Sequence, residues 1–555
     1  MTIRGRGRPF FSKGGAAMLR ATLFGMLFFS LVFCQGILAQ GINEQDTFCA
    51  AEEIVGITWG DFCGSPEPSE ICGIEFSSIY SDNENNFIIL LEGDRRSAPG
   101  PSLFGIYAQK FNNEGEPISE IFQIQDNNEK EVYAQAPSLV FNNDGSFVVA
   151  WNIDLLGRNV FDIYVQRYNR DCEKIGEKFI VNTERLGNQY MCSIANNSRG
   201  DFIFVWGSDS QEDDCDLCGS IYAQRFDREG FAIGSEFHVN TYEIGFQFSP
   251  DVAMDENGVA FIIWHDGYAG KQDGLDGDGS GIFGQLIDRE NNKIGSQVRI
   301  NSTTTKNQIG ARIKWNEGLG FLVSWLSHER GQIIDGKNEY ILKAQRYNDN
   351  GEAIGSEITL IDSLRRFSNL DFLVFSFSRN NSGLSMLAHP IIFPENNTYQ
   401  INIQTYNNEL DRIGENILIS SPRGTQFIYP SLTMNNDNAF VVYREVLGSC
   451  RKPPCSVSNL INVSKVSCDK LFVRGGVNAD GQVNLSDAVF VIYYLFRDGG
   501  KPNCLDAADI NDDGALDLAD PIYLLNYLFV DGPAPLPPFP ASGFDPTPDN
   551  LMCEN

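Results

Sequence analysis

The sequence predicts a mainly β protein, a seven-bladed β-propeller of four-stranded antiparallel blades, followed by a small α-helical domain. One observation is the stretch Ser220–Trp264, whose short runs of β-branched and aromatic residues end at Asn, Asp or Gly, as strands and turns do. A second is that this stretch recurs along the chain with a fixed internal spacing. A third is a change of composition near Leu471, where two matched loop–helix segments begin.

The repeat is marked by a glutamine and an isoleucine nine residues later, although the loops around them vary. The glutamines recur at steps of 57 to 61 residues, at Gln109, Gln166, Gln224, Gln285, Gln345 and Gln404. The isoleucines are Ile118, Ile175, Ile233, Ile294, Ile354 and Ile413. A constant strand–turn–strand offset between variable loops indicates a stacked β-sheet repeat.

Counting hairpins gives seven blades between residues 73 and 465, after a Cys-containing segment 40–72. The second strand of each hairpin ends at an apolar residue: Leu91, Trp151, Trp206, Trp264, Trp325, about Leu387, and Tyr443. Such units bury their faces when they are arranged radially, which leaves only short, protected edges. The last copy lacks a clear fourth strand, so we expect residues 53–59 to close the ring. A six- or eight-bladed ring and an open β-solenoid are the alternatives.

The connections sort into two ends of this ring. Turns such as Asn142–Gly145 and Asp227–Gly230 are tight and share one end. The longer connections share the other end and include acidic insertions at 211–216 and 273–281. These loops are either a binding surface or solvated connections.

The N-terminal segment 1–39 has a basic part followed by an apolar run, which predicts a secretory signal peptide; a membrane anchor is the alternative. The formal charge is −31, and removal of five basic residues with no acids would leave −36. This acidity argues against nucleic acid as a partner. The even count of twelve cysteines after Cys34 indicates disulfides in a secreted or cell-surface protein. We interpret Cys215–Cys218 as a structural disulfide or loop clip rather than a zinc or redox pair.

Two calcium loops are predicted, 33 residues apart. Oxygen ligands at loop positions 1, 3, 5, 7, 9 and 12, with Gly at position 6, are what such a loop requires. In the second loop these ligands are Asp509, Asn511, Asp513, Ala515 (through its carbonyl), Asp517 and Asp520. In the first loop they are Asn478, Asp480, Gln482, Asn484 and Asp487, while Gly476 takes position 1. We therefore expect one strong Ca²⁺ site and one weaker or water-completed site.

The paired loop–helix segments over residues 471–530 resemble a dockerin domain. This resemblance implies folding on calcium and docking onto a cohesin-like protein partner. At loop positions 10 and 11, where the family carries Ser-Thr, this chain has Leu485-Ser486 and Leu518-Ala519, so its partner would differ from the ordinary one. The repeats before this segment resemble those of bacterial secreted and surface propeller proteins, which implies a fold but no activity.

The helices of this domain are expected to share a core, and the Pro-rich tail 531–555 to be fastened to it. The core residues that we expect are Val489, Ile492, Leu495, Ile522, Leu525 and Leu528. A Cys504–Cys553 disulfide would hold the tail.

The sequence favours a secreted, non-catalytic binding or scaffold protein with a propeller surface, possible glycan binding there, and a calcium-dependent docking module. The alternative is an extracellular carbohydrate-active enzyme, a propeller hydrolase or lyase attached to an assembly by that module. The four histidines are His238, His265, His328 and His389, and common catalytic motifs are absent. Only His265-Asp266 and His328-Glu329 offer an imidazole beside an acid at the loop-rich end.

Overall fold

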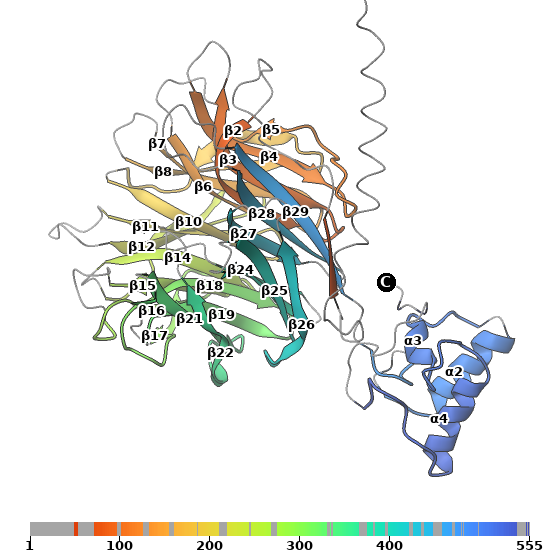
Figure 1. The fold of residues 1–555 in the computed structure, drawn as a ribbon. Coiled ribbons are helices and arrows are strands. Elements are labelled where there is room, and N and C mark those ends of the chain that lie inside the picture. Colours follow the sequence, from red (N-terminus) through yellow and green to blue (C-terminus); the bar gives the residue numbers. More distant parts are fainter. Residues whose placement is uncertain are drawn as a thin grey trace, which may run out of the picture. The chain divides into compact units, whose positions relative to one another are not determined.

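The computed structural model of the chain describes seven β-sheets and a helical module (Figure 1). The expected signal segment 1–39, the Cys215–Cys218 pair and the insertion at 211–216 lie outside the described residues. The residues described are 49–53, 71–96, 102–125, 133–154, 160–185, 187–209, 219–242, 246–267, 275–329, 333–334, 337–365, 375–380, 383–393, 398–420, 426–434, 438–447, 458–468, 472–478, 480, 482–497, 499–540, 551 and 553.

The sheets follow one another along the chain, and within each one neighbouring strands are antiparallel. The first contains β2 (Ile71–Ser81), β3 (Phe87–Arg96), β4 (Ser102–Phe111) and β5 (Phe122–Gln123). The second contains β6 (Tyr133–Phe141), β7 (Phe147–Asp154), β8 (Asp162–Tyr168) and β9 (Lys174–Ile180). The third contains β10 (Gln189–Asn196), β11 (Phe202–Ser208), β12 (Ser220–Phe226) and β13 (Ala232–His238). The fourth contains β14 (Gln247–Met254), β15 (Ala260–Asp266), β16 (Gly281–Ile287) and β17 (Lys293–Arg299).

The remaining three sheets complete a seven-bladed propeller, which confirms the predicted fold class. The fifth contains β18 (Gln308–Asn316), β19 (Gly320–Ser327), β20 (Ile333–Ile334), β21 (Lys337–Tyr347) and β22 (Ala353–Arg365). The sixth contains β23 (Ser376–Arg379), β24 (Ser385–Phe393), β25 (Thr398–Tyr406) and β26 (Arg412–Ser420). The seventh contains β27 (Gln426–Met434), β28 (Asn438–Leu447), β29 (Ser458–Cys468) and β1 (Cys49–Glu53).

The seventh blade is completed by a strand from the other end of the chain. Strand β1 pairs antiparallel with β29, in a register that runs from Cys49 opposite Cys468 to Glu53 opposite Ser464. Of the expected closing strand 53–59, only Glu53 is among the described residues. The backbone hydrogen bonds of β1 and β29 thus join the two ends of the propeller sequence.

The hydrophobic core lies between neighbouring blades. Each of seven apolar clusters among the described residues combines side chains of two adjacent sheets. One of them packs Phe87 and Leu91 of the first blade against Phe440 and Val442 of the seventh, so the ring is closed. The repeat tryptophans lie near the ends of the second strands and are fully buried in these layers: Trp151, Trp206, Trp264 and Trp325.

The repeated glutamine explains the nine-residue offset seen in the sequence. In the third blade, the Gln224 side-chain amide donates to the carbonyls of Arg225 (2.9 Å), Ile233 (3.4 Å) and Gly234 (3.3 Å). These bonds bridge a β-bulge between β12 and β13, where Gly234 has a φ of +74° that suits glycine. Equivalent bonds are made by Gln166, Gln285, Gln345 and Gln404. The glutamine therefore braces the sheet and is not a ligand-binding residue.

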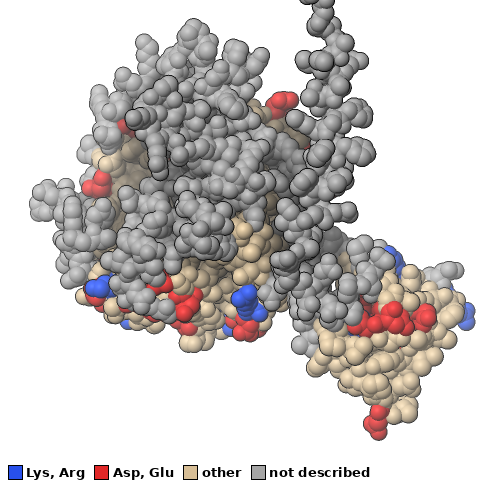
Figure 2. All heavy atoms as spheres, viewed as in Figure 1, with Lys and Arg blue, Asp and Glu red and all other residues tan. Residues whose placement is uncertain are grey.

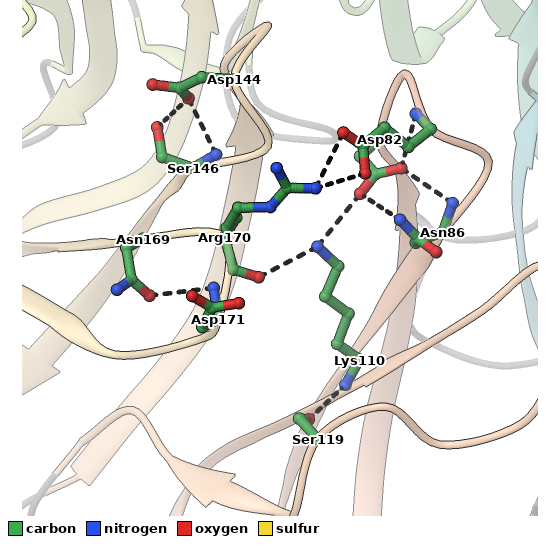
Figure 3. A network of polar contacts seen from close by, with 10 residues as sticks. Asp82, Asn86, Lys110, Ser119, Asp144, Ser146, Asn169, Arg170 and Asp171 are labelled. Carbon is green, nitrogen blue, oxygen red and sulfur yellow. Dashed lines mark hydrogen bonds and ion pairs between the residues drawn. The ribbon is translucent and has the colours of Figure 1, made fainter.

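A basic residue beside the glutamine links each of several blades to the next. Figure 3 shows Lys110 of the first blade, whose Nζ lies 3.1 Å from the Asp82 carboxylate and donates to the Arg170 carbonyl of the second blade (3.3 Å). The Lys110 and Asp82 side chains are 6% and 1% exposed, so this ion pair is buried. Arg170 in turn donates to the Glu84 carboxylate. The same link to a turn carbonyl of the next blade is made by Arg167 to Arg228, Arg225 to Asp288, and Arg346 to Asn408.

The helical module contains α2 (Leu485–Phe496), α3 (Leu505–Ala508) and α4 (Ala519–Phe529). Its core combines residues of α2, α3 and α4 with residues of the loops that precede the helices: Val477, Ala488, Val491, Ala508, Ile510 and Leu524. Of the core residues expected from the sequence, Ile492, Leu495, Leu525 and Leu528 are partly buried. Val489 and Ile522, however, are 42% and 47% exposed. The reason is that Val477 and Ile510, which lie in the loops, occupy part of the core of the module. Fewer side chains of each helix are therefore buried in that core.

Candidate calcium loops and docking surface

The carboxylate at position 12 of the second loop ties that loop to the start of α4. Asp520 lies in the first turn of α4 and is fully buried. One of its oxygens accepts from the backbone N–H groups of Ile510 (2.8 Å) and Asn511 (3.4 Å), and the other accepts from Asp517 (2.8 Å). Through these bonds the loop backbone at positions 2, 3 and 9 bends around the Asp520 side chain, as a cation-binding loop requires.

Position 1 organises the turn of the same loop. Asp509 is fully buried, and its carboxylate accepts from the backbone N–H groups of Asp513 (3.2 Å) and Gly514 (2.7 Å). Gly514 has a φ of +78°, which is the sharp bend expected of the glycine at position 6. The structure thus places Asp509 and Asp520 on either side of the same short loop.

Asp513, Ala515 and Asp517, which are predicted ligands of the second loop, are exposed. The Asp513 carboxylate accepts from the Asn511 amide (2.9 Å) and the Ala515 N–H (3.1 Å), and Asp517 accepts from the Ala519 N–H (2.6 Å).

The second loop has two features that a bound hard cation would compensate. The Asn511 Oδ1 atom at position 3 is buried and has no hydrogen-bond partner, although a buried amide oxygen normally has one. Burial, and next the nearby Asp509 charge, raise the pKa of Asp520 to about 7, against the opposing effect of its backbone hydrogen bonds. A Ca²⁺ ion bound there would give the oxygen a partner and offset the carboxylate charge.

The first loop repeats this arrangement without a carboxylate at position 1. Asp487 is fully buried and accepts from the backbone N–H groups of Val477 (2.7 Å), Asn478 (3.0 Å) and Asn484 (2.9 Å), which are again positions 2, 3 and 9. Asn484 is the N-cap of α2 and forms a capping box with Asp487. Gly476 provides no side-chain ligand at position 1, so the two loops differ in charge.

The polar side chains of the first loop bond mostly to one another. The Asn478 amide donates to Asp480 (3.0 Å) and to Ser486 (2.7 Å). Hydrogen bonds, led by the Gln482 backbone N–H, lower the pKa of the exposed Asp480 carboxyl, which keeps it ionised.

The two helices expose matching stripes of apolar side chains, starting at loop position 10 in each repeat. On α2 the exposed residues are Leu485, Val489, Tyr493 and Phe496. On α4 and its ends they are Leu518, Ile522, Phe529 and Val530. Figure 2 shows that the face of the module in view is largely uncharged, with acidic side chains in a band and at its lower end and basic ones at its margins. Exposed large apolar side chains that form a stripe mark a surface for a partner.

The histidines among the described residues are engaged in the blades. His265 is buried and accepts the Ala311 N–H of the next blade (3.1 Å), and burial lowers its pKa to about 3. His389 is buried between Pro390 and Asn402, and burial lowers its pKa to about 4. Both rings are therefore neutral parts of the fold.

The acids next to these histidines in sequence also have structural partners. Asp266 accepts from Gln247 (2.8 Å) and from the Leu275 N–H. Glu329 forms an ion pair with Lys343, which also pairs with Glu357 (2.7 Å). Among the described residues, Asp266 and Glu329 thus have partners other than the imidazoles that precede them in the sequence.

In the C-terminal region, one structural feature was predicted from the sequence and another was not. The expected Cys504–Cys553 disulfide is present. Cys504, Asp506 and Cys553 also form a cluster of potential metal ligands within 4.8 Å of one another, but the two sulfur atoms are bonded to each other. Arg474, fully buried beside the second loop, was not singled out from the sequence, because a lone arginine carries no periodic signal.

Within the described part of the chain, no helix has the length and apolar character needed to cross a bilayer.

Comparisons with known proteins give different results for the C-terminal module and for the rest of the chain. The family model for the dockerin type I domain matches residues 474–529. No curated protein is significantly similar to the chain. An ulvan lyase from a polysaccharide lyase family is 9% identical, with a TM-score of 0.43, over 75% of this chain and 94% of that one. The polysaccharide lyase Uly1 is 9% identical, with a TM-score of 0.40, over 78% and 94%. An α-L-arabinofuranosidase from Lactobacillus brevis is 12% identical, with a TM-score of 0.30, over 50% and 90%. Residues 474–529 are a dockerin type I domain, and a seven-bladed β-propeller precedes it.

Proposed function

We propose that this chain is a secreted or cell-surface, non-catalytic binding or scaffold protein that docks through its C-terminal module when calcium is bound. The observation that carries this proposal is the pair of exposed apolar stripes, each of which begins at position 10 of a calcium loop. The predicted sites would hold Ca²⁺ through Asp509, Asn511, Asp513, Ala515, Asp517 and Asp520, and through Asn478, Asp480, Gln482, Asn484 and Asp487.

The N-terminus of each helix is fixed only when the calcium loop before it is ordered. Asp487 and Asp520 are first-turn residues whose carboxylates hold the loop backbone, so a disordered loop would free the N-terminus of the helix. When bound, Ca²⁺ neutralises the loop carboxylates, whose mutual repulsion otherwise opposes this order. The stripes are therefore presented only when the loops are closed.

The chemistry of the stripes points to an apolar face on a cohesin-like protein partner. Leu485 and Leu518 provide methyl groups at position 10, and Tyr493, Phe496 and Phe529 extend the surface along the helices. Aromatic and aliphatic side chains of this kind act as anchors in protein interfaces. Because these side chains are uncharged, we expect the affinity to change little with ionic strength.

A panel of purified cohesin modules tests this proposal on the full chain. We expect at least one module to bind in calcium and to dissociate on chelation. Since the stripe is duplicated, the Val489→Asp/Ile522→Asp double variant is needed, and it should bind about 100-fold more weakly or worse. The matched control is Phe231→Asp, which adds the same charge at a 71% exposed residue of the propeller. Binding that survives the double variant, or the absence of binding by every module, would contradict the proposal.

We propose that the propeller provides a second binding surface, with glycans as the candidate ligands. A screen of the full chain against polysaccharides should record both binding and depolymerisation. Binding without product is the expected result. Release of oligosaccharides would instead establish the carbohydrate-active enzyme considered from the sequence.

A further inference from the structure

A buried arginine joins the second calcium loop to the C-terminal tail. Arg474 is fully buried, and its guanidinium donates to the backbone carbonyls of Asp506 (3.1 Å) and Asp509 (2.6 Å). A third contact is an ion pair with the Asp512 carboxylate (2.8 Å), in which the two side chains are 1% and 5% exposed. The Nε atom donates to the Pro537 carbonyl (3.0 Å). One planar group therefore bonds both to the loop and to the tail.

The segment Asp531–Pro540, which we name the strap, is bound to the module at several points. The backbone N–H of Arg474 donates to the Pro538 carbonyl (2.7 Å), and the Tyr523 hydroxyl donates to the Ala534 carbonyl (3.2 Å). Pro535 and Pro538 are both buried.

Two further contacts fasten the C-terminal region. The Phe539 ring lies edge-on to Tyr527 of α4, with centroids 5.4 Å apart. The Cys504–Cys553 disulfide joins the end of the chain to the N-cap of α3, a few residues before the second loop.

The position of Asp512 shows what Arg474 does for the loop. Asp512 is loop position 4, which is not a ligand position, and its φ of +57° is unusual for a residue other than glycine. Its carboxylate pairs with Arg474 instead of facing the other carboxylates of the loop. A guanidinium can hold such a set of acceptors in fixed directions, which an ammonium group cannot.

In the part of the chain that the structure describes, the first loop has no counterpart of this arginine. The residue 33 positions after Arg474 in the duplicated segment is Ala507, which has no side-chain donor. The braced loop contains five carboxylates, Asp509, Asp512, Asp513, Asp517 and Asp520, whereas the first loop contains only Asp480 and Asp487. The brace is thus located where repulsion between carboxylates is greatest.

We infer that Arg474 is a positioning residue for the second calcium loop, and that the strap holds Arg474 in place and so sets the calcium affinity of that loop. This inference rests on the proposed function, because it assumes that the loops bind calcium. It adds that residues far outside the ligand set, at the end of the chain, control the binding. Groups that hold metal ligands in place without touching the metal typically change metal affinity by about 10- to 100-fold when they are removed.

The test is a calcium titration of the full chain, followed by hydrogen–deuterium exchange of peptides from each loop. In Arg474→Met, the calcium concentration that half-protects residues 509–520 should rise about 10-fold or more, while that for residues 476–487 stays within about threefold. Arg474→Lys should give an intermediate shift, because it keeps the charge but not the fork of donors. Arg497→Met, at an exposed arginine that ends α2, is the matched control and should cause no shift.

A chain that ends at Val530 provides a second variant, because it lacks the strap, together with the Cys504–Cys553 disulfide, but keeps Arg474. It should shift the midpoint of residues 509–520 in the same direction as Arg474→Met. Midpoints within about threefold of the parent in both variants would overturn the inference. Loops that show no calcium-dependent protection in the parent chain would instead overturn the proposed calcium-dependent docking, so the two failures are distinguishable.

Discussion

Single side chains hold the blades together by satisfying backbone carbonyls. Gln285 is fully buried, and its amide donates to the carbonyls of Leu286 (3.1 Å), Ile294 (3.0 Å) and Gly295 (3.5 Å). A buried carbonyl that loses its donor costs free energy because water cannot replace the donor.

Substitution of Gln285 separates this bonding role from simple packing. We expect Gln285→Met to lower the free energy of unfolding by about 1 to 3 kcal/mol, because volume is kept and donors are lost. Gln285→Glu should cost more, because at neutral pH its carboxylate would face the same carbonyl oxygens. Denaturant unfolding followed by tryptophan fluorescence measures both. A Gln285→Met variant that is as stable as the parent would show that Gln285 acts by volume alone.

The buried histidines predict how the propeller responds to acid. His265 and His389 have pKa values lowered to about 3 and about 4, below the value of about 6.5 expected in the unfolded chain. Unfolding therefore takes up protons below pH 6.5, and stability that is complete above this pH is lost as the pH falls. Each histidine should contribute a loss of about 1.4 kcal/mol per pH unit.

The measurement is the denaturant midpoint of the propeller between pH 6.5 and 5, above the range in which ordinary carboxylates titrate. The parent should lose stability across this window, and His265→Gln/His389→Gln should lose less. The slope, rather than the absolute stability, is compared, since either substitution also changes packing. An unchanged slope in the double variant would show that these imidazoles do not titrate on unfolding.

At the scale of elements, closure of the ring depends on a strand from the N-terminal side of the repeats. Strand β1 covers the edge of β29, and without it a row of backbone groups on β29 would be unpaired. We expect a chain that begins at residue 54 to unfold at lower temperature and to aggregate, compared with one that begins at Thr47. Calorimetry and light scattering test this. Equal melting temperatures would mean that β1 contributes nothing to closure.

The fold could be predicted because its repeated signal has a direct physical cause. The Gln–Ile offset is fixed by the bond from Gln224 to the Ile233 carbonyl, so it persists while loops change length. The calcium loops could be predicted from the sequence for a similar reason, since local geometry determines the ligand positions and the glycine at position 6.

Other features could not be predicted from the sequence, because they depend on contacts between distant parts of the chain. The sequence of β1, Cys-Ala-Ala-Glu-Glu, has no strand signal of its own, and it is a strand because it pairs with β29. The exposure of Val489 and Ile522 depends on loop residues that fill the core first. Arg474 acquires its role only when the loop and the strap meet around it.

For the whole molecule, we expect two independently stabilised parts. The propeller core lies between its sheets, whereas the helical module has separate apolar clusters and depends on loops rich in carboxylates. Among residues 471–555 there is no tryptophan, and all 6 tryptophans precede them, so tryptophan fluorescence does not report on the helical module. The two parts can therefore be followed separately in the intact chain.

The central claim, that calcium orders the docking module but not the propeller, is tested most directly by chelation of the full chain. Limited proteolysis with mass spectrometry should show new cleavage within residues 474–529 when calcium is removed, reversed when it is restored. Over the same transition the tryptophan emission should stay unchanged. A module that resists the protease equally well without calcium, or a propeller whose emission shifts with it, would contradict the account.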